Sequence, residues 1–170
     1  MDGGLPLPVP DGVDPEVGLE AAIGPAIARL RQTFASTEAY LDFWRAHPAL
    51  AGHWTADVEA FARYDLTGEA PNMRSRVAVD AISPDGRDVT ADKPFADALG
   101  RLTRPTPLLT APTGFLGDPP GLLPPELVAA WAERVPYLRP QRVPDVNHYT
   151  ILFDKQAAAT VVRAITTAAV

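Results

Sequence analysis

The spacing of hydrophobic and polar residues changes character near residue 106. Upstream of that point, apolar side chains recur at intervals of three and four residues, the spacing of helices with one buried face. Ser36 and Thr55 occupy N-cap positions, and Asp14-Pro15 is typical of a helix start. This pattern predicts four helices, over 16–31, 37–47, 56–64 and 93–102.

Downstream, two short runs of strand length, Thr106–Ala111 and Arg139–Val143, alternate with two helical segments. The first helix is expected near 126–134 and the second over 155–169, with Asp154 as its cap. A strand–helix–strand–helix order with these lengths predicts an α/β class with two parallel strands joined by a helical crossover.

Finer features follow from local residue types. Residues 65–68 and 83–86 are expected to be turns, and 72–80 fits either a helix or an extended segment. The apolar spacing also predicts which helix positions face inward. These are Val58, Phe61 and Ala62 in the third helix, Leu127, Ala130 and Trp131 near 126–134, and Ala158, Val161, Val162, Ile165 and Ala169 in the last helix.

Composition narrows the classes of function. The 170 residues carry a net charge of −6 with no long run of like charge, which argues against nucleic acid or an anionic membrane as the main partner. With no cysteine, the chain has neither disulfides nor thiolate ligands, and its three histidines lack metal-ligand spacing, so neither metal nor cofactor is expected. Without a membrane-spanning run or a targeting segment, the default expectation is a cytoplasmic protein.

One histidine stands in a position suited to chemistry. His148 follows the strand expected over 139–143 and precedes the last helical segment. In open α/β sheets, ligands and reacting groups gather just past the carboxyl ends of the strands, and an imidazole there can exchange a proton near neutral pH. The alternative interpretation is a turn histidine bonded to nearby backbone.

The segment Val143-Pro-Asp-Val-Asn-His-Tyr-Thr150, together with Pro105–Ala111, resembles the C-terminal third of an α/β-hydrolase. The order of elements from Leu102 to Val170 carries the resemblance. It implies a partial α/β-hydrolase fold: 1–10 leaving a core strand, 11–102 forming a helical lid, and 103–170 forming the C-terminal core. Rival interpretations are a disordered arm for the first segment and a plain helical bundle for the second.

By this resemblance, His148 is the base of a hydrolytic site, and either Asp2 or Asp118 orients it. Asp118 lies further past its strand than the family pattern prefers, so Asp2 is slightly favoured. The Gly-x-Ser-x-Gly turn that carries the nucleophile is missing, since Ser36, Ser75 and Ser83 all stand in other contexts. The chain is therefore expected to be inactive alone.

The resemblance also implies a small, apolar, ester-like substrate, with Phe34, Tyr40, Phe43, Trp44 and Trp54 either lining its pocket or packing a core. Two parallel strands alone leave an open edge, which predicts an exposed apolar patch beside 106–111. A complementary N-terminal hydrolase half or a second copy of the chain would cover that edge. Two further hypotheses are a non-catalytic interaction module derived from a degenerate hydrolase and an unrelated helical protein whose two strands do not pair.

Overall fold

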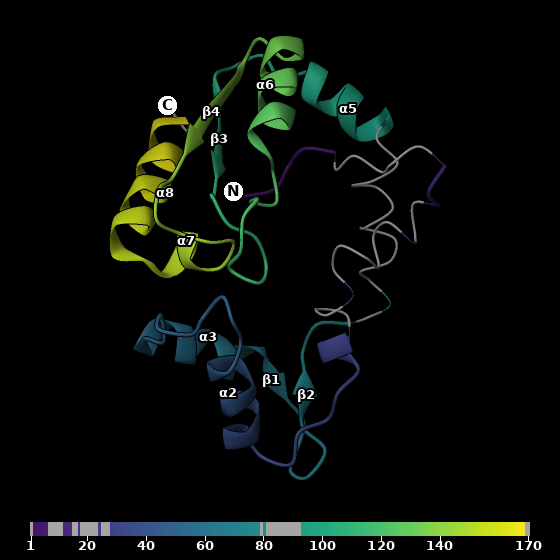
Figure 1. Cartoon of the computed structure of the whole chain (residues 1–170), viewed down its shortest axis with the longest axis vertical. Helices are drawn as coiled ribbons and strands as arrows, with labels where there is room; N and C mark the ends of the chain where they lie inside the picture. Colours follow the sequence, from purple (N-terminus) through teal and green to yellow (C-terminus); the bar gives the residue numbers. More distant parts are fainter. Residues whose placement is uncertain are drawn as a thin grey trace. The chain divides into compact units, whose positions relative to one another are not determined.

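The structure is a computed structural model that describes residues 2–6, 12–14, 17, 24, 28–78, 80 and 93–168 (Figure 1). The chain forms two compact units. The first unit comprises Met1–Leu5, His47–His53 and Lys93–Val170, and the second comprises Pro6–Ala46 and Trp54–Asp92. Residues 47–53 and 93–102, which fall inside the segment expected to be a lid, thus belong to the first unit.

A parallel pair of strands forms the centre of the first unit. Strand β3 (Thr106–Thr110) pairs with β4 (Leu138–Arg142) in register from Thr106↔Leu138 to Thr110↔Arg142. Helix α6 (Pro125–Arg134) makes the crossover between them, and α7 (Thr150–Phe153) and α8 (Lys155–Ala168) follow. The expected parallel crossover is confirmed, and the hypothesis of a helical protein with unpaired strands is wrong. Helix α5 (Lys93–Gly100) precedes β3.

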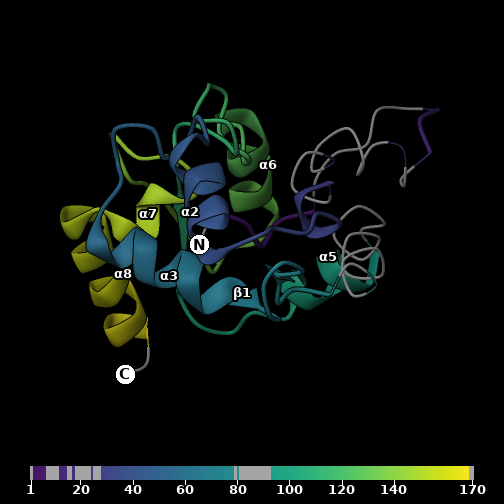
Figure 2. The same ribbon diagram turned by 90° about the horizontal axis from the view of Figure 1, so that it is seen from below.

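Helices α8 and α6 lie on opposite sides of this sheet (Figures 1 and 2). Because side chains alternate along a strand, Leu109 and Ala111 share one face, and both belong to the buried cluster that contains Ala157 and Val161 of α8. Asp154 caps α8 as expected, by accepting hydrogen bonds from the backbone N–H groups of residues 156 and 157.

The sequence gives the inward faces of two helices of this unit only in part, since Trp131 and Val161 are buried as predicted and other predicted positions are not. In α8, Ala157 and Val161 are buried whereas Val162 and Ile165 are each 57% exposed. Both stripes of α8 are apolar, so periodicity alone cannot choose between them. In α6 the buried residues are Val128 and Trp131; the expected positions Leu127 and Ala130 are half-buried and exposed.

Among the residues that the structure describes, β3 itself does not carry the exposed apolar patch that the sequence predicts beside 106–111. Leu108 to Ala111 are buried, and the backbone N–H of Asp2 donates to the Leu109 carbonyl at 2.6 Å, so residue 2 occupies part of the edge opposite β4. Strand β4 is itself an edge, with residues 139–142 exposed and Pro140 among them. Proline is tolerated there because an edge strand leaves N–H groups unpaired.

In the second unit, α2 (Thr37–Arg45) and α3 (Ala56–Asp65) have the expected N-caps, since the Ser36 and Thr55 hydroxyls accept hydrogen bonds from the N–H groups of Ala39 and Val58.

The expected turn at 65–68 is instead part of an antiparallel hairpin. Strand β1 (Leu66–Thr67) pairs with β2 (Arg74–Ser75), which also settles 72–80 in favour of extended backbone near its start. Two-residue strands carry no periodic signal.

A buried carboxylate holds this unit together. Asp65 accepts hydrogen bonds from the hydroxyls of Tyr40 and Ser75 and pairs with Arg29 at 2.9 Å. Burial, followed by the hydrogen bond to Asp65, raises the pKa of Tyr40 to about 12. The aromatic rings of Phe34, Tyr40 and Trp44 pack edge to face around this cluster and are buried.

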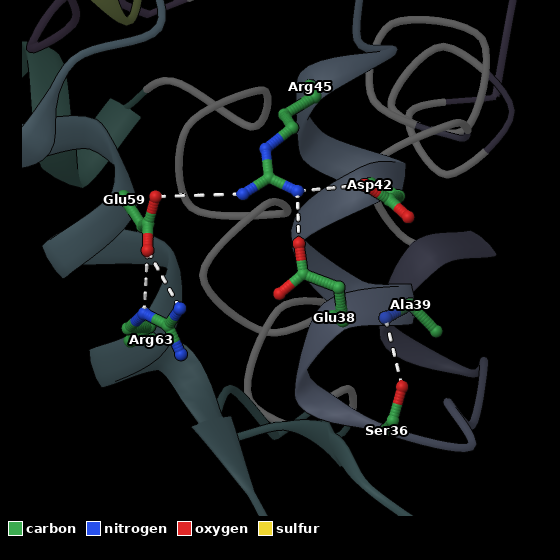
Figure 3. A network of polar contacts seen from close by, with 7 residues as sticks. All are labelled: Ser36, Glu38, Ala39, Asp42, Arg45, Glu59 and Arg63. Carbon is green, nitrogen blue, oxygen red and sulfur yellow. Dashed lines mark hydrogen bonds and ion pairs between the residues drawn. The ribbon is translucent and has the colours of Figure 1, made fainter.

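On the surface of the same unit, Arg45 at the end of α2 contacts Glu38 and Asp42 of its own helix and Glu59 of α3, which in turn binds Arg63 (Figure 3). Such exposed pairs contribute little to stability individually.

Phe61, expected to face inward from α3, is 46% exposed. Most of the helix expected over 16–31, and the turn expected at 83–86, lie outside the described residues.

Candidate functional site

His148 lies in a turn between β4 and α7 that Asn147 organises. The Asn147 side-chain oxygen accepts hydrogen bonds from the N–H groups of Tyr149 and Thr150, each at 2.9 Å. Its amide nitrogen donates to the carbonyl of Ala49 at 2.7 Å, and its backbone N–H donates to the Thr150 hydroxyl at 2.8 Å. Asn147, Thr150 and Ala49 are all buried. These bonds fix the backbone on both sides of the histidine.

The loop that follows β3 supports the same turn. The backbone N–H of His148 donates to the Thr113 carbonyl at 3.1 Å, and the Thr113 hydroxyl donates to the Val146 carbonyl at 3.2 Å. The residues after β3 therefore bond to the residues after β4, beyond the ends of the two strands. This places His148 past the carboxyl ends of the parallel strands, where the sequence predicts it to lie.

The imidazole contacts Asp2. The Nδ1 atom of His148 lies 2.9 Å from Oδ2 of Asp2. The other carboxylate oxygen, Oδ1, accepts a hydrogen bond from the Ala111 N–H at 2.8 Å. The Asp2 side chain is 1% exposed and that of His148 is 26% exposed. The carboxylate is thus held on one oxygen by the residue that follows β3 and on the other by the imidazole, while the histidine reaches solvent.

The backbone of Asp2 is unusual, since its φ of 42° lies in the left-handed region. That region is sparsely populated by residues other than glycine, although aspartate enters it more readily than most. Such conformations cost on the order of 1–3 kcal/mol and occur often at functional sites. Here the hydrogen bonds to Leu109 and Ala111 hold Asp2 in place.

The contact between Nδ1 and the Asp2 carboxylate indicates the roles of the two ring nitrogens. A carboxylate oxygen accepts hydrogen bonds, so in the neutral imidazole Nδ1 carries the proton that points to Asp2. The lone pair is then on Nε2, which is free to accept a proton from a reacting group. The pair can therefore act as a base held in a single orientation.

Aromatic rings surround the imidazole. The centroid of the Phe115 ring lies 4.3 Å from that of His148, and the Tyr149 ring lies 5.5 Å from it. Tyr149 also meets His47 edge to face, at 5.3 Å between centroids. The histidine is consequently bordered by apolar ring surface on the side of the loop after β3.

The structure separates the two carboxylates considered as partners of His148. Asp118 is exposed, and its backbone carbonyl accepts a hydrogen bond from Gly114 within the loop after β3. Asp2 makes the contact to the imidazole. Ser36 and Ser75 lie in the second unit, one as a helix cap and one bonded to Asp65, and Ser83 falls outside the described residues.

Sequence reasoning did not single out Asn147 or Phe115. Asn147 stands next to the histidine in a turn that follows a proline, and asparagine commonly bonds to backbone two and three residues ahead. This tendency of asparagine could have identified Asn147 from the sequence as the residue that organises the turn. Phe115 lies in a glycine-containing loop after a strand, but nothing local indicates that its ring meets residue 148.

Two negative observations apply to the part of the chain that the structure describes. No group of three or more histidine, aspartate or glutamate side chains is placed to hold a metal ion. Within the same residues, every helix is too short or too polar to cross a lipid bilayer.

Comparison with known proteins gives a fold. No family model matches the sequence, and no curated protein matches it significantly. The mixed helix–sheet structure, however, shares its fold with a solved hydrolase structure. The similarity is to the crystal structure of E-2-(acetamidomethylene)succinate hydrolase, with a TM-score of 0.65 and 17% identity. The match covers 88% of this chain and 51% of the hydrolase, so the chain spans about half of that protein's length. At this identity the likeness shows a shared fold only.

Proposed function

We propose that this chain provides the base of a hydrolytic site, with His148 as the catalytic residue and Asp2 as the residue that positions it. The observation that carries the proposal is the 2.9 Å contact between His148 Nδ1 and a buried carboxylate whose other oxygen is bonded to the Ala111 N–H. The alternative interpretation, a turn histidine with no chemical role, does not account for a fully buried carboxylate partner whose backbone lies in the left-handed region. The fold shared with a hydrolase supports the same conclusion.

In the proposed reaction, Nε2 of His148 takes the proton from a serine hydroxyl as its oxygen attacks the carbonyl carbon of an ester-like bond. The imidazolium then gives that proton to the leaving oxygen as the C–O bond breaks, which leaves an acyl-enzyme. A water molecule repeats the sequence and returns the free acid and the serine. The Asp2 side chain stabilises the imidazolium through the contact to Nδ1.

None of the three serines of this chain is suited to be the nucleophile in this scheme. Ser36 and Ser75 have structural hydrogen bonds, and neither follows a strand in a tight turn before a helix, while Ser83 stands directly before a proline in the sequence. We therefore propose that the chain is inactive by itself and completes its site with a complementary half that carries the nucleophile. The Phe115 and Tyr149 rings beside His148 favour a small apolar acyl or alcohol group.

The rival proposal is a non-catalytic interaction module, in which the second unit is a docking surface. Exposed aromatic side chains on α3 favour it, because Phe61 is 46% and Tyr64 is 74% exposed, three residues apart on one helix. Large aromatic residues are enriched at protein interfaces. This role requires neither the Asp2–His148 contact nor a reactive imidazole.

A mixing experiment separates the two. The full chain is mixed with a complementary N-terminal hydrolase half that contains a Gly-x-Ser-x-Gly turn, and hydrolysis of a short-chain aryl ester is followed. We expect activity only on mixing, a loss of about 10²–10⁴-fold with His148→Ala, and a comparable loss with Asp2→Asn. Asp118→Asn, which changes an exposed aspartate in the neighbouring loop, is the matched control and should retain activity. Activity on mixing that is indifferent to His148→Ala would refute the proposed base.

The chain alone offers a second readout. Nitrogen-15 NMR of the His148 ring should show the proton on Nδ1 in the neutral form, because the Asp2 carboxylate accepts it. Asp2→Asn should change the tautomer, since an amide can turn its NH₂ group toward the ring, whereas Asp118→Asn should not. A ring that is protonated on Nε2 in the unmodified chain would rule out the proposed orientation.

A further inference from the structure

A pocket of about 270 Å³ lies in the first unit on the α6 side of the sheet. Its walls come from the end of β3, the loop before α6, the first turns of α6 and the end of β4. Thr110 and Arg142, which are paired in the register of the two strands, both line it. The pocket is therefore next to the carboxyl ends of the parallel strands, the position at which open α/β sheets bind ligands.

The pocket is lined largely by apolar residues, among them Ala111, Leu123, Val128 and Pro140. Arg142 is the single charged residue in its lining, and in the described part of the chain its guanidinium forms no ion pair. A few polar groups within an apolar concavity are what small-molecule sites present. An unpaired guanidinium is the group that best matches a carboxylate.

The lining contains neither histidine, carboxylate nor serine, and His148 is not part of it. The lining therefore suits a binding site rather than a second reactive centre. The volume is slightly below the usual range for ligand pockets, and it equals the space of roughly nine water molecules. Only a small ligand fits.

The backbone around the pocket is closely packed on one side. Gly121 lies so near β3 that an added Cβ would stand 2.1 Å from the Ala111 carbonyl oxygen. Ala111 lines the pocket and also donates its N–H to Asp2. The pocket wall is thus continuous with the residue that holds the Asp2 carboxylate.

We propose that this pocket binds a small carboxylate with an apolar body, and that Arg142 pairs with the carboxylate group while Leu123 and Val128 contact the body. The site is independent of the proposed hydrolytic role, because its lining includes neither Asp2 nor His148.

Benzoate, which joins one apolar ring to one carboxylate, is the probe, and benzamide is its neutral counterpart. The full chain is titrated with each, and backbone amide shifts of Ala111 and Ala129 are followed by NMR. We expect saturable benzoate binding in the millimolar range and about fivefold weaker binding of benzamide, the difference that an exposed ion pair can supply. Arg142→Gln should weaken benzoate binding about fivefold and bring it level with benzamide.

Two variants make the test selective. Arg139→Gln removes the same charge from the same strand but outside the pocket lining, and it should leave the benzoate affinity unchanged. Ala129→Leu should fill part of the pocket from the exposed side of α6 and weaken both probes alike. Equal affinity for benzoate and benzamide, an equal loss with Arg139→Gln, or shifts that do not saturate would each overturn the proposal.

Discussion

Asn147 gives the sharpest test of how the turn around His148 is held. Asn147→Ala would remove one acceptor of two backbone N–H groups and one donor to a carbonyl. Of the groups left behind, the Thr150 N–H and the Ala49 carbonyl belong to residues that are 3% and 1% exposed, whereas Tyr149 is half-buried. The cost should therefore come mainly from two buried groups that lose their partners.

A buried group that loses its hydrogen bond costs about 1–3 kcal/mol. Two such groups give about 2–6 kcal/mol, and water entering beside half-buried Tyr149 brings the expected loss to about 3 kcal/mol. For a domain of this length, this corresponds to a decrease in Tm of roughly 6–12 °C. Asn147→Asp should cost a similar amount, because it keeps the acceptor but places a carboxylate against the Ala49 carbonyl.

The assay is urea and thermal unfolding of the full chain, with hydrogen exchange of the Tyr149 and Thr150 amides as a local readout. Both amides should exchange faster in Asn147→Ala. Asn72→Ala, which truncates an exposed asparagine in the second unit, is the control and should stay within about 0.5 kcal/mol of the unmodified chain. If Asn147→Ala costs less than about 1 kcal/mol and leaves exchange unchanged, these hydrogen bonds do not hold the turn.

Two further predictions concern packing and pH. Gly121→Ala should lower the free energy of unfolding in urea by about 1–3 kcal/mol, because the new Cβ would overlap the Ala111 carbonyl. The control is Gly100→Ala at the end of α5, whose Cβ meets no atom within 4 Å and should be tolerated. Equal stabilities of the two variants would contradict the close approach of Gly121 to Ala111. Burial raises the pKa of Tyr40 to about 12, so the unfolded chain loses the hydroxyl proton near pH 10, before the folded chain does. The free energy of unfolding should therefore fall by up to about 2–3 kcal/mol as the pH rises from 10 through 12. Tyr40→Phe should remove that part of the decline and Tyr64→Phe, at a 74% exposed position, should not; an unchanged slope in Tyr40→Phe would assign the decline to other groups.

Local signals in the sequence were sufficient where the structure depends on local contacts. The caps Ser36, Thr55 and Asp154 each bond to backbone two or three residues ahead, so residue type and position predict them. The parallel pairing of β3 and β4 was also predictable, since a helix of ten residues between two short strands leaves few other connections.

Features that depend on distant residues were not predictable in this way. Asp65 is buried because Arg29, Tyr40 and Ser75 meet it from three separate segments, and no window of sequence contains all four. The inward face of α8 was predicted too broadly for a related reason. That helix has two apolar stripes, and the burial of Val161 but not of Val162, both predicted to face inward, depends on how the helix packs against β3 and not on its own sequence.

At the candidate site, the sequence narrowed the partner of His148 to Asp2 or Asp118, and the resemblance slightly favoured Asp2. Both are aspartates near turns, and Asp118 is much closer to His148 along the chain, so proximity in sequence alone would have favoured the contact that the structure does not show. The edge of β3 determines which of the two carboxylates contacts His148. Because the N–H of residue 2 donates to the Leu109 carbonyl, the Asp2 carboxylate lies at the end of that strand, where it meets both the Ala111 N–H and the imidazole from the turn after β4. The order of neighbours in the sheet, rather than any motif, therefore selects the carboxylate that can orient His148.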